Sequence, residues 1–162
     1  NNKINGQLNL SADDIYSKHT LIDSFESRLR FVNGDILFEQ FILNLGKLGA
    51  ADLTGIINNE KRFTNFKFEN NIFLDNLKRF YSKFGIHNKK NIPFNLFTSG
   101  NFDLVNLNMR LHEISSDAKL ENEEVAYIER EFNNLVLEDG YASLFNFVKL
   151  KEFVRLVATE TN

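Results

Sequence analysis

The sequence predicts a mainly β fold of the α+β class: a curled antiparallel meander sheet with one amphipathic helix, at about 71–85, packed on it. Three observations support this. Several segments alternate apolar and polar residues with a period of two, an Asn-Gly pair marks a tight hairpin, and one segment changes to a helical period. The 162 residues fit one ordinary domain, and the composition, 43% hydrophobic and 25% charged, is that of a globular chain. We therefore expect a single β-rich domain over 1–162, with one or two helices.

The first two strands and their turn are the clearest local elements. Alternate apolar residues occupy 4–10 and 25–31, so every second side chain lies on the same face of a sheet. The pair Asn33-Gly34 follows directly, and both residue types tolerate the positive φ that a type I′ turn requires. The sequence therefore predicts a hairpin at this pair.

The returning strand, from Asp35 to about Leu45, has apolar residues at both odd and even positions. Strict alternation would place four of them on one face of the sheet: Leu37, Phe41, Leu43 and Leu45. The other face would carry Ile36, Phe38 and Ile42. The alternation resumes at 51–57 and again at 66–68, with a turn predicted at Asn58-Asn59.

The period then becomes helical. Apolar side chains recur at i, i+4, i+7, i+8 and i+11 and form the predicted packing face of the helix: Phe73, Leu77, Phe80, Tyr81 and Phe84. Asn70 or Asn71 can cap the start of this helix, and Gly85 can adopt the left-handed conformation at its end.

The last third of the chain contains one clear strand and one ambiguous segment. Residues 105–111 alternate apolar and polar side chains, as a half-exposed strand does. Segment 121–135 is compatible with a charged helix, because Val125, Ile128 and Phe132 are spaced by three and four, and also with a strand. Asp139-Gly140 predicts a hairpin, which favours strands at the end of the chain.

Residue patterns for catalysis and metal binding are missing from the sequence. The chain has no cysteine, and its three histidines, His19, His87 and His112, are isolated from one another. Phosphate-binding glycine loops and nucleophile motifs do not occur either. We expect a non-catalytic protein without cofactor or metal. A net charge of −3 without a basic stripe also makes nucleic acid an unsuitable partner.

The predicted strands carry more apolar surface than one helix can cover. A helix about 10 Å wide masks about two strands at their spacing of about 4.8 Å. Curling of the sheet, a neighbouring domain or an apolar ligand would have to cover the rest. No apolar run approaches the roughly 20 residues that span a bilayer. The chain begins at Asn1 and its one methionine is Met109, so we expect its ends to be boundaries within a longer protein.

Two adjoining segments resemble the C-terminal β-repeat region of AsmA-like proteins. They are Leu29-Arg-Phe-Val-Asn-Gly-Asp-Ile-Leu-Phe and Leu43-Asn-Leu-Gly-Lys-Leu-Gly-Ala-Ala-Asp-Leu-Thr-Gly. Ser99-Gly100-Asn-Phe-Asp-Leu and Leu137-Glu-Asp-Gly140-Tyr are similar to further copies. The resemblance implies a periplasmic segment of a bacterial envelope protein, whose parent is anchored in the inner membrane by an N-terminal helix. It also implies an elongated, curled sheet that helps phospholipid reach the outer membrane.

On this resemblance the chain would shield acyl chains on its concave face. The predicted lipid-contacting residues are Leu37, Phe41, Leu43, Leu107, Met109 and Leu111. The alternative is a structural or protein-interaction module whose apolar face docks on neighbouring domains of its own parent protein.

Overall fold

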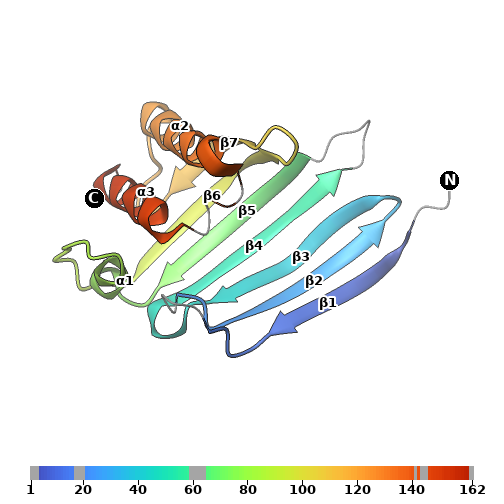
Figure 1. The fold of residues 1–162 in the computed structure, drawn as a ribbon, viewed down its shortest axis with the longest axis horizontal. Helices are drawn as coiled ribbons and strands as arrows, with labels where there is room; N and C mark the ends of the chain where they lie inside the picture. The colour runs from blue at the N-terminus through green and yellow to red at the C-terminus, as the bar shows by residue number, and fades with distance from the viewer. Residues whose placement is uncertain (1–3, 17–20, 59–64, 141, 143–145, 161–162) are drawn as a thin grey trace.

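The computed structural model describes residues 4–16, 21–58, 65–140, 142 and 146–160. Seven antiparallel strands form one sheet in which spatial order equals chain order (Figure 1). The strands are β1 (Gly6–Ala12), β2 (Ser24–Val32), β3 (Asp35–Asn44), β4 (Gly49–Asn58), β5 (Asn65–Leu74), β6 (Phe94–Asp103) and β7 (Asn108–Ser115). The helices are η1 (Gly46–Leu48), a short 3-10 turn, and α1 (Leu77–Lys83), α2 (Asn122–Asp139) and α3 (Phe147–Glu160).

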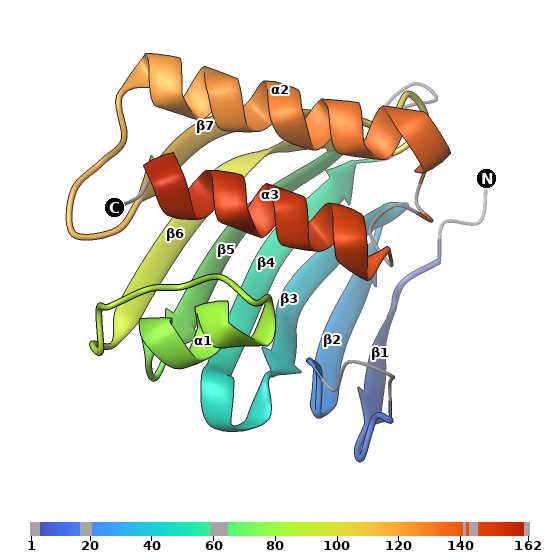
Figure 2. The same ribbon diagram turned by 60° about the vertical axis from the view of Figure 1, so that its left-hand side comes forward.

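This architecture confirms the predicted α+β fold with an antiparallel meander. The predicted curl is wrong, because the strands form an open, twisted sheet that does not bend strongly back on itself (Figures 1 and 2). The described residues contain three α-helices, where one or two were expected. The extra helices both come from the C-terminal part of the chain.

The hairpin at Asn33-Gly34 is confirmed. Asn33 has φ 53° and Gly34 has φ 93°, and Val32 pairs with Asp35 across the turn. The side chain of Asn5 supports the turn, since its Oδ1 accepts a hydrogen bond of 2.8 Å from the Asn33 N–H.

The predicted helix at 71–85 is shorter than expected. Residues up to Leu74 belong to β5, and α1 begins only at Leu77. The N-cap is Asn76, whose Oδ1 accepts from the Arg79 N–H at 2.9 Å, so neither Asn70 nor Asn71 caps this helix. Gly85 has φ 63° and ends it as predicted.

Phe73 therefore belongs to a strand and not to the packing face of the helix. It lies on the polar face of β5 and is 46% exposed. The remaining predicted packing residues do turn inward: Leu77, Tyr81 and Phe84 are buried, and Phe80 is half-buried. Leu77 and Tyr81 form one core cluster with Leu74 and with Ala158 of α3.

The ambiguous segment 121–135 is helical. It forms most of α2, and a capping box at its start joins the backbone and side chains of Glu121 and Glu124. Val125 and Ile128 are buried in a second core cluster with Ile114 and Leu120.

The predicted hairpin at Asp139-Gly140 is wrong. Asp139 is the last residue of α2, and Gly140 follows as its C-cap with φ 61°. The expected strand after it overlaps residues 141 and 143–145, which lie outside the described residues, and Phe147 begins α3. The fourth proposed repeat copy, which starts at Leu137, is thus not a strand pair.

Candidate functional site

One row of paired residues shows how the two faces of the sheet differ. On the face that carries the helices, a row across all strands consists of apolar residues and glycine: Leu8, Leu29, Phe38, Gly55, Phe68, Gly100 and Leu111. The neighbouring row on the opposite face is largely polar: Gln7, Arg30, Leu37, Ile56, Lys67, Asn101 and Arg110. The sheet is therefore amphipathic, with one face suited to burial and one to water.

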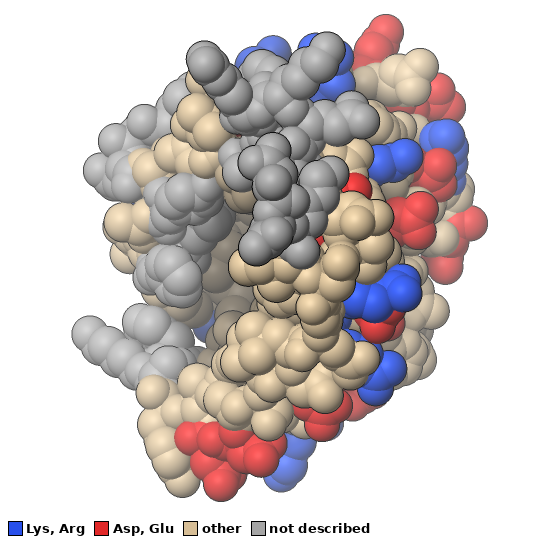
Figure 3. Space-filling view, turned by 90° about the vertical axis from the view of Figure 1, so that its right-hand side faces the viewer, with Lys and Arg blue, Asp and Glu red and all other residues tan. Residues whose placement is uncertain are grey.

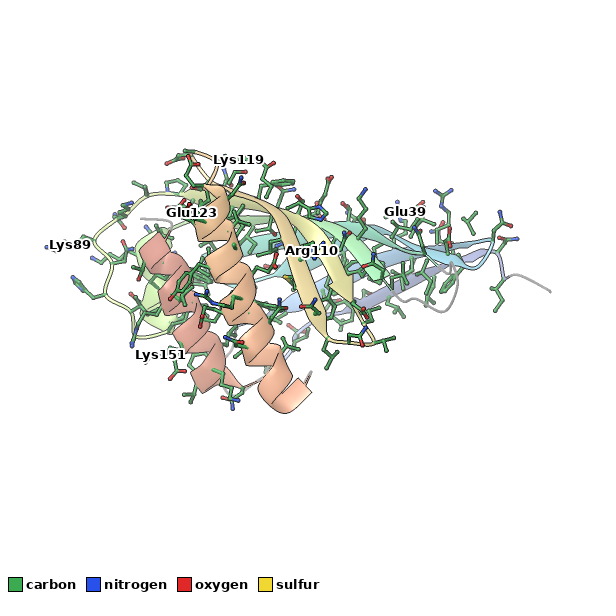
Figure 4. The ribbon with its side chains drawn as sticks, turned by 90° about the horizontal axis from the view of Figure 1, so that it is seen from above. Glu39, Lys89, Arg110, Lys119, Glu123 and Lys151 are labelled. Carbon is green, nitrogen blue, oxygen red and sulfur yellow. The ribbon has the colours of Figure 1, made fainter. Side chains whose placement is uncertain are left out.

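The figures agree with this assignment. Figure 3 shows many charged side chains along one side of the molecule, and beside them a hollow whose described border is mostly uncharged. In Figure 4, Glu39 lies on the side of the sheet opposite to α2 and α3. Glu39 pairs there with Arg30 of β2 at 2.6 Å, an exposed ion pair of the kind that adds little stability.

The helices cover the apolar face unevenly. They gather over the β5–β7 side of the sheet, as Figures 1 and 4 show. On the β1–β3 side, Leu8 and Leu10 are 41% and 46% exposed, and Phe25, Phe38 and Phe41 are only half-buried. In the described part of the chain, a broad strip of apolar sheet is thus left partly open to solvent.

An open cavity of about 610 Å³ lies between the helices and the apolar face of the sheet, beside the uncovered part. Its floor is the apolar face of β3 to β7, and its walls come from α1, α2 and α3. Asn70, Thr98 and Tyr81 are its polar lining residues; the others are aliphatic or aromatic. The volume lies within the range of roughly 300–1,000 Å³ typical of small-molecule pockets.

The structure brings together three of the six predicted lipid-contacting residues. Leu43 of β3 and Met109 and Leu111 of β7 all line the cavity. They come from strands at opposite sides of the cavity floor, so the cavity spans most of the sheet's width.

Phe41 lies on the same face as the cavity but beyond its lining. Its register partners are Ser27 and Leu53, and its ring stacks on Phe25 with centroids 6.0 Å apart. It therefore belongs to the uncovered strip.

Leu37 does not share the face of Phe41 and Leu43. The register shifts between Phe38 and Phe41 because β3 contains one extra residue opposite β4, a β-bulge. Across the bulge, the residues that face the helices change from even-numbered to odd-numbered positions. Phe38, Phe41 and Leu43 therefore lie on the same face, and Leu37 points to the polar face. Simple alternation misses this, because the pattern Ile-Leu-Phe-Glu-Gln-Phe offers apolar residues at both parities.

Leu107 lies in the turn between β6 and β7. It has φ 53°, which is unusual for a branched aliphatic residue, and it precedes the strand that was expected to contain it. The predicted alternation from Val105 to Leu111 therefore holds only from Asn108 onward.

One contribution that sequence reasoning missed is the border formed by α2. The backbone N–H of Met109 donates to Asn133 Oδ1 at 2.7 Å, and Asn133 Nδ2 donates to the Met109 carbonyl at 2.8 Å. The N–H of Leu111 donates to Glu129 Oε2 at 2.6 Å. Two polar side chains spaced by four on α2 thus take the place of a further strand along β7.

The other border of the sheet is different. The described residues place no strand beside the outer edge of β1, whose sequence, Gly6 to Ala12, contains no charged residue. Charged residues and covering elements are the usual protection of such an edge. The sheet is therefore closed along β7 and open along β1.

Further observations bear on the chemistry that this site can support. Among the described residues, no three His, Cys, Asp or Glu side chains gather where they could hold a metal ion. Within the same residues, no helix has the length and hydropathy needed to span a bilayer.

Comparison of the chain with protein-family models, with curated proteins and with solved structures finds no match.

Proposed function

We propose that this chain is a non-catalytic segment that shields phospholipid acyl chains on the apolar face of its sheet. The observation that carries the proposal is the cavity of about 610 Å³, which is lined almost wholly by apolar side chains and borders the partly exposed apolar strip, where Phe25 pairs with the cavity residue Leu43. Transfer of each methylene group from water to such a surface is worth about 0.8 kcal/mol. A single acyl chain would thus bind without any specific polar contact.

The resemblance to AsmA-like proteins supports the same function and suggests where it acts. On that basis we propose a periplasmic location, a parent protein anchored in the inner membrane, and a role in lipid supply to the outer membrane. The open β1 edge fits a sheet that is one part of a longer lipid-shielding surface.

Native mass spectrometry of the purified chain, after incubation with phospholipid vesicles, tests the proposal. We expect retained phospholipid on the wild type and its loss in Leu43→Asp, which puts a charge into the cavity. The matched control is Ile42→Asp, since Ile42 is the adjacent half-buried residue on the opposite face. A wild type without lipid, or equal retention by the two variants, would refute the proposal.

The second candidate is a protein-interaction module that docks through its apolar strip and β1 edge. The asymmetry of the two sheet borders favours it, because β1 offers an uncharged strand with Leu8 and Leu10 exposed on one face. A purified protein that is free of lipid and dimeric in size-exclusion chromatography with light scattering would favour this candidate over lipid shielding.

A further inference from the structure

Two polar side chains lie in the middle of the apolar cavity floor. Asn70 of β5 and Thr98 of β6 are register partners on the helix-covered face, and both line the cavity. Their neighbours on this face are Leu53 across from Asn70, Ile114 across from Thr98, and Phe68 and Ile72 along β5. The pair is therefore an isolated polar spot within an apolar surface.

Both residues are half-buried, and no hydrogen bond joins either side chain to another described residue. Because no buried side-chain nitrogen or oxygen among the described residues lacks a partner, the polar atoms of Asn70 and Thr98 face the open space of the cavity. An amide or a hydroxyl on an apolar surface is unfavourable unless it forms a hydrogen bond. Leucine and valine, of nearly the same sizes, would complete the apolar floor without this disadvantage. Water can serve these two groups while the cavity is open, so an acyl lipid that displaces the water must itself accept their hydrogen bonds.

We propose that Asn70 and Thr98 form a polar subsite for the ester carbonyl of an acyl lipid. Both side chains can donate, Asn70 through Nδ2 and Thr98 through its hydroxyl, and a carbonyl oxygen has two lone pairs to accept from them. The carbon chain attached to the carbonyl then runs over the apolar floor on one side of the pair. This inference rests on the proposed function, since it assumes that the cavity takes acyl chains, and it adds the chemical group that the site selects.

The position of the pair suits this role. Asn70 is near the centre of β5, with the apolar side chains of Phe66 and Phe68 on one side and of Ile72 and Leu74 on the other. At about 3.3 Å per residue, each half of the strand offers roughly 13–16 Å of apolar floor. A site that hydrogen-bonds a ligand group discriminates against analogues without that group, because its own donors would remain unpaired.

The experiment compares two ligands that differ only at the carbonyl. Lysophosphatidylcholine with a palmitoyl ester chain and its hexadecyl ether counterpart are titrated into the wild-type chain by isothermal titration calorimetry. We expect the ester to bind about threefold to tenfold more tightly than the ether, because only the ester carbonyl can accept a hydrogen bond from the pair. Equal affinities of the wild type for the two ligands would overturn the subsite and leave the proposed function intact, whereas binding of neither would refute both.

Variants then assign the preference to the pair. Asn70→Leu/Thr98→Val removes both donors at nearly constant volume, and we expect it to bind ester and ether equally. The control Asn71→Leu/Thr54→Val makes the same changes on the opposite face, where both residues are exposed, and should keep the ester preference. An ester preference that survives in the first variant would also overturn the inference. The wild-type comparison does not depend on the folding of either variant.

Discussion

Asn133 of α2 binds the backbone of Met109 at two points, as acceptor from its N–H at 2.7 Å and as donor to its carbonyl at 2.8 Å. This pairing reproduces with one side chain the two hydrogen bonds that a neighbouring strand would make. It fixes α2 along the border of the sheet and so positions the wall of the cavity that α2 provides.

Asn133→Ala should destabilise the protein by about 1–3 kcal/mol, because it removes two partly buried hydrogen bonds and leaves backbone groups of β7 unpaired. Urea unfolding followed by circular dichroism measures the change. The control is Asn134→Ala, at the next, exposed position of the same helix, which should change stability by about 0.5 kcal/mol or less. Equal effects of the two substitutions would show that the border contact is unimportant.

Gly100→Ala should be strongly destabilising. A methyl group at Gly100 would lie 2.4 Å from the Arg110 carbonyl oxygen and 3.2 Å from the ring of Phe68, so the strand would have to shift. We expect a loss of about 1–3 kcal/mol. Gly6→Ala is the matched strand control, since nothing lies within 4 Å of the added methyl group, and it should leave the urea midpoint almost unchanged. A neutral Gly100→Ala would contradict the close packing of β6 on β7.

Phe73 and Phe84 should respond very differently to truncation. Phe84 is 2% exposed and stacks on Phe147 with ring centroids 5.5 Å apart, so Phe84→Ala should cost about 3–5 kcal/mol. Phe73 is 46% exposed on the polar face, and Phe73→Ala should cost no more than about 1 kcal/mol. Thermal denaturation of both variants checks this. Similar losses would instead favour the longer helix that the sequence predicted.

The β6–β7 turn should add a pH dependence to stability. Asp103 accepts hydrogen bonds from the N–H groups of Asn106 and Val105 and from the Asn106 side chain, and these bonds hold its pKa below the ordinary value of 3.8. A carboxyl whose pKa is lower in the folded state stabilises the protein above its unfolded-state pKa. This stabilisation is lost as the pH falls from about 3.8 through the lower folded-state value.

Urea midpoints measured from pH 7 down to acid conditions test this effect. Asp103→Asn should lower the midpoint at neutral pH and bring the variant closer to the wild type in acid, because the amide cannot ionise. A constant difference between the two proteins at every pH would show that the carboxylate charge at this turn plays no part.

Local signals predicted much of the fold. The hairpin turn is specified mainly by Asn33 and Gly34, because asparagine tolerates positive φ and glycine, without a Cβ, adopts it freely, and the structure has both residues at positive φ. The alternation of apolar and polar residues in the strands on either side of the turn is likewise a local pattern, which can be read from a few consecutive residues. For the same reason the meander itself was predictable.

The errors arose where one local pattern fits two structures. Phe73 lies four residues before Leu77, which is helical spacing, yet a strand ends at Leu74 between them. Asp139-Gly140 is a hairpin signal, yet glycine at positive φ also ends helices, and here it ends α2. Only long-range contacts decide between such alternatives.

The site was predictable only in part. Alternation placed Leu43, Met109 and Leu111 correctly on the apolar face, because it is regular over the short stretches from Phe41 to Leu43 and from Met109 to Leu111. The position of Leu37 depends on a bulge that the register with β4 reveals, and the polar pair Asn70 and Thr98 becomes visible only when β5 and β6 are aligned.

The different borders of the sheet give the molecule a direction. Side chains of α2 seal the last strand, whereas the first strand keeps its outer backbone groups available within the described residues. Any lengthening of this sheet must therefore proceed from β1. The α2 helix then forms a terminal wall, and a larger sheet assembled from such a unit would have one closed end and one end open to further strands.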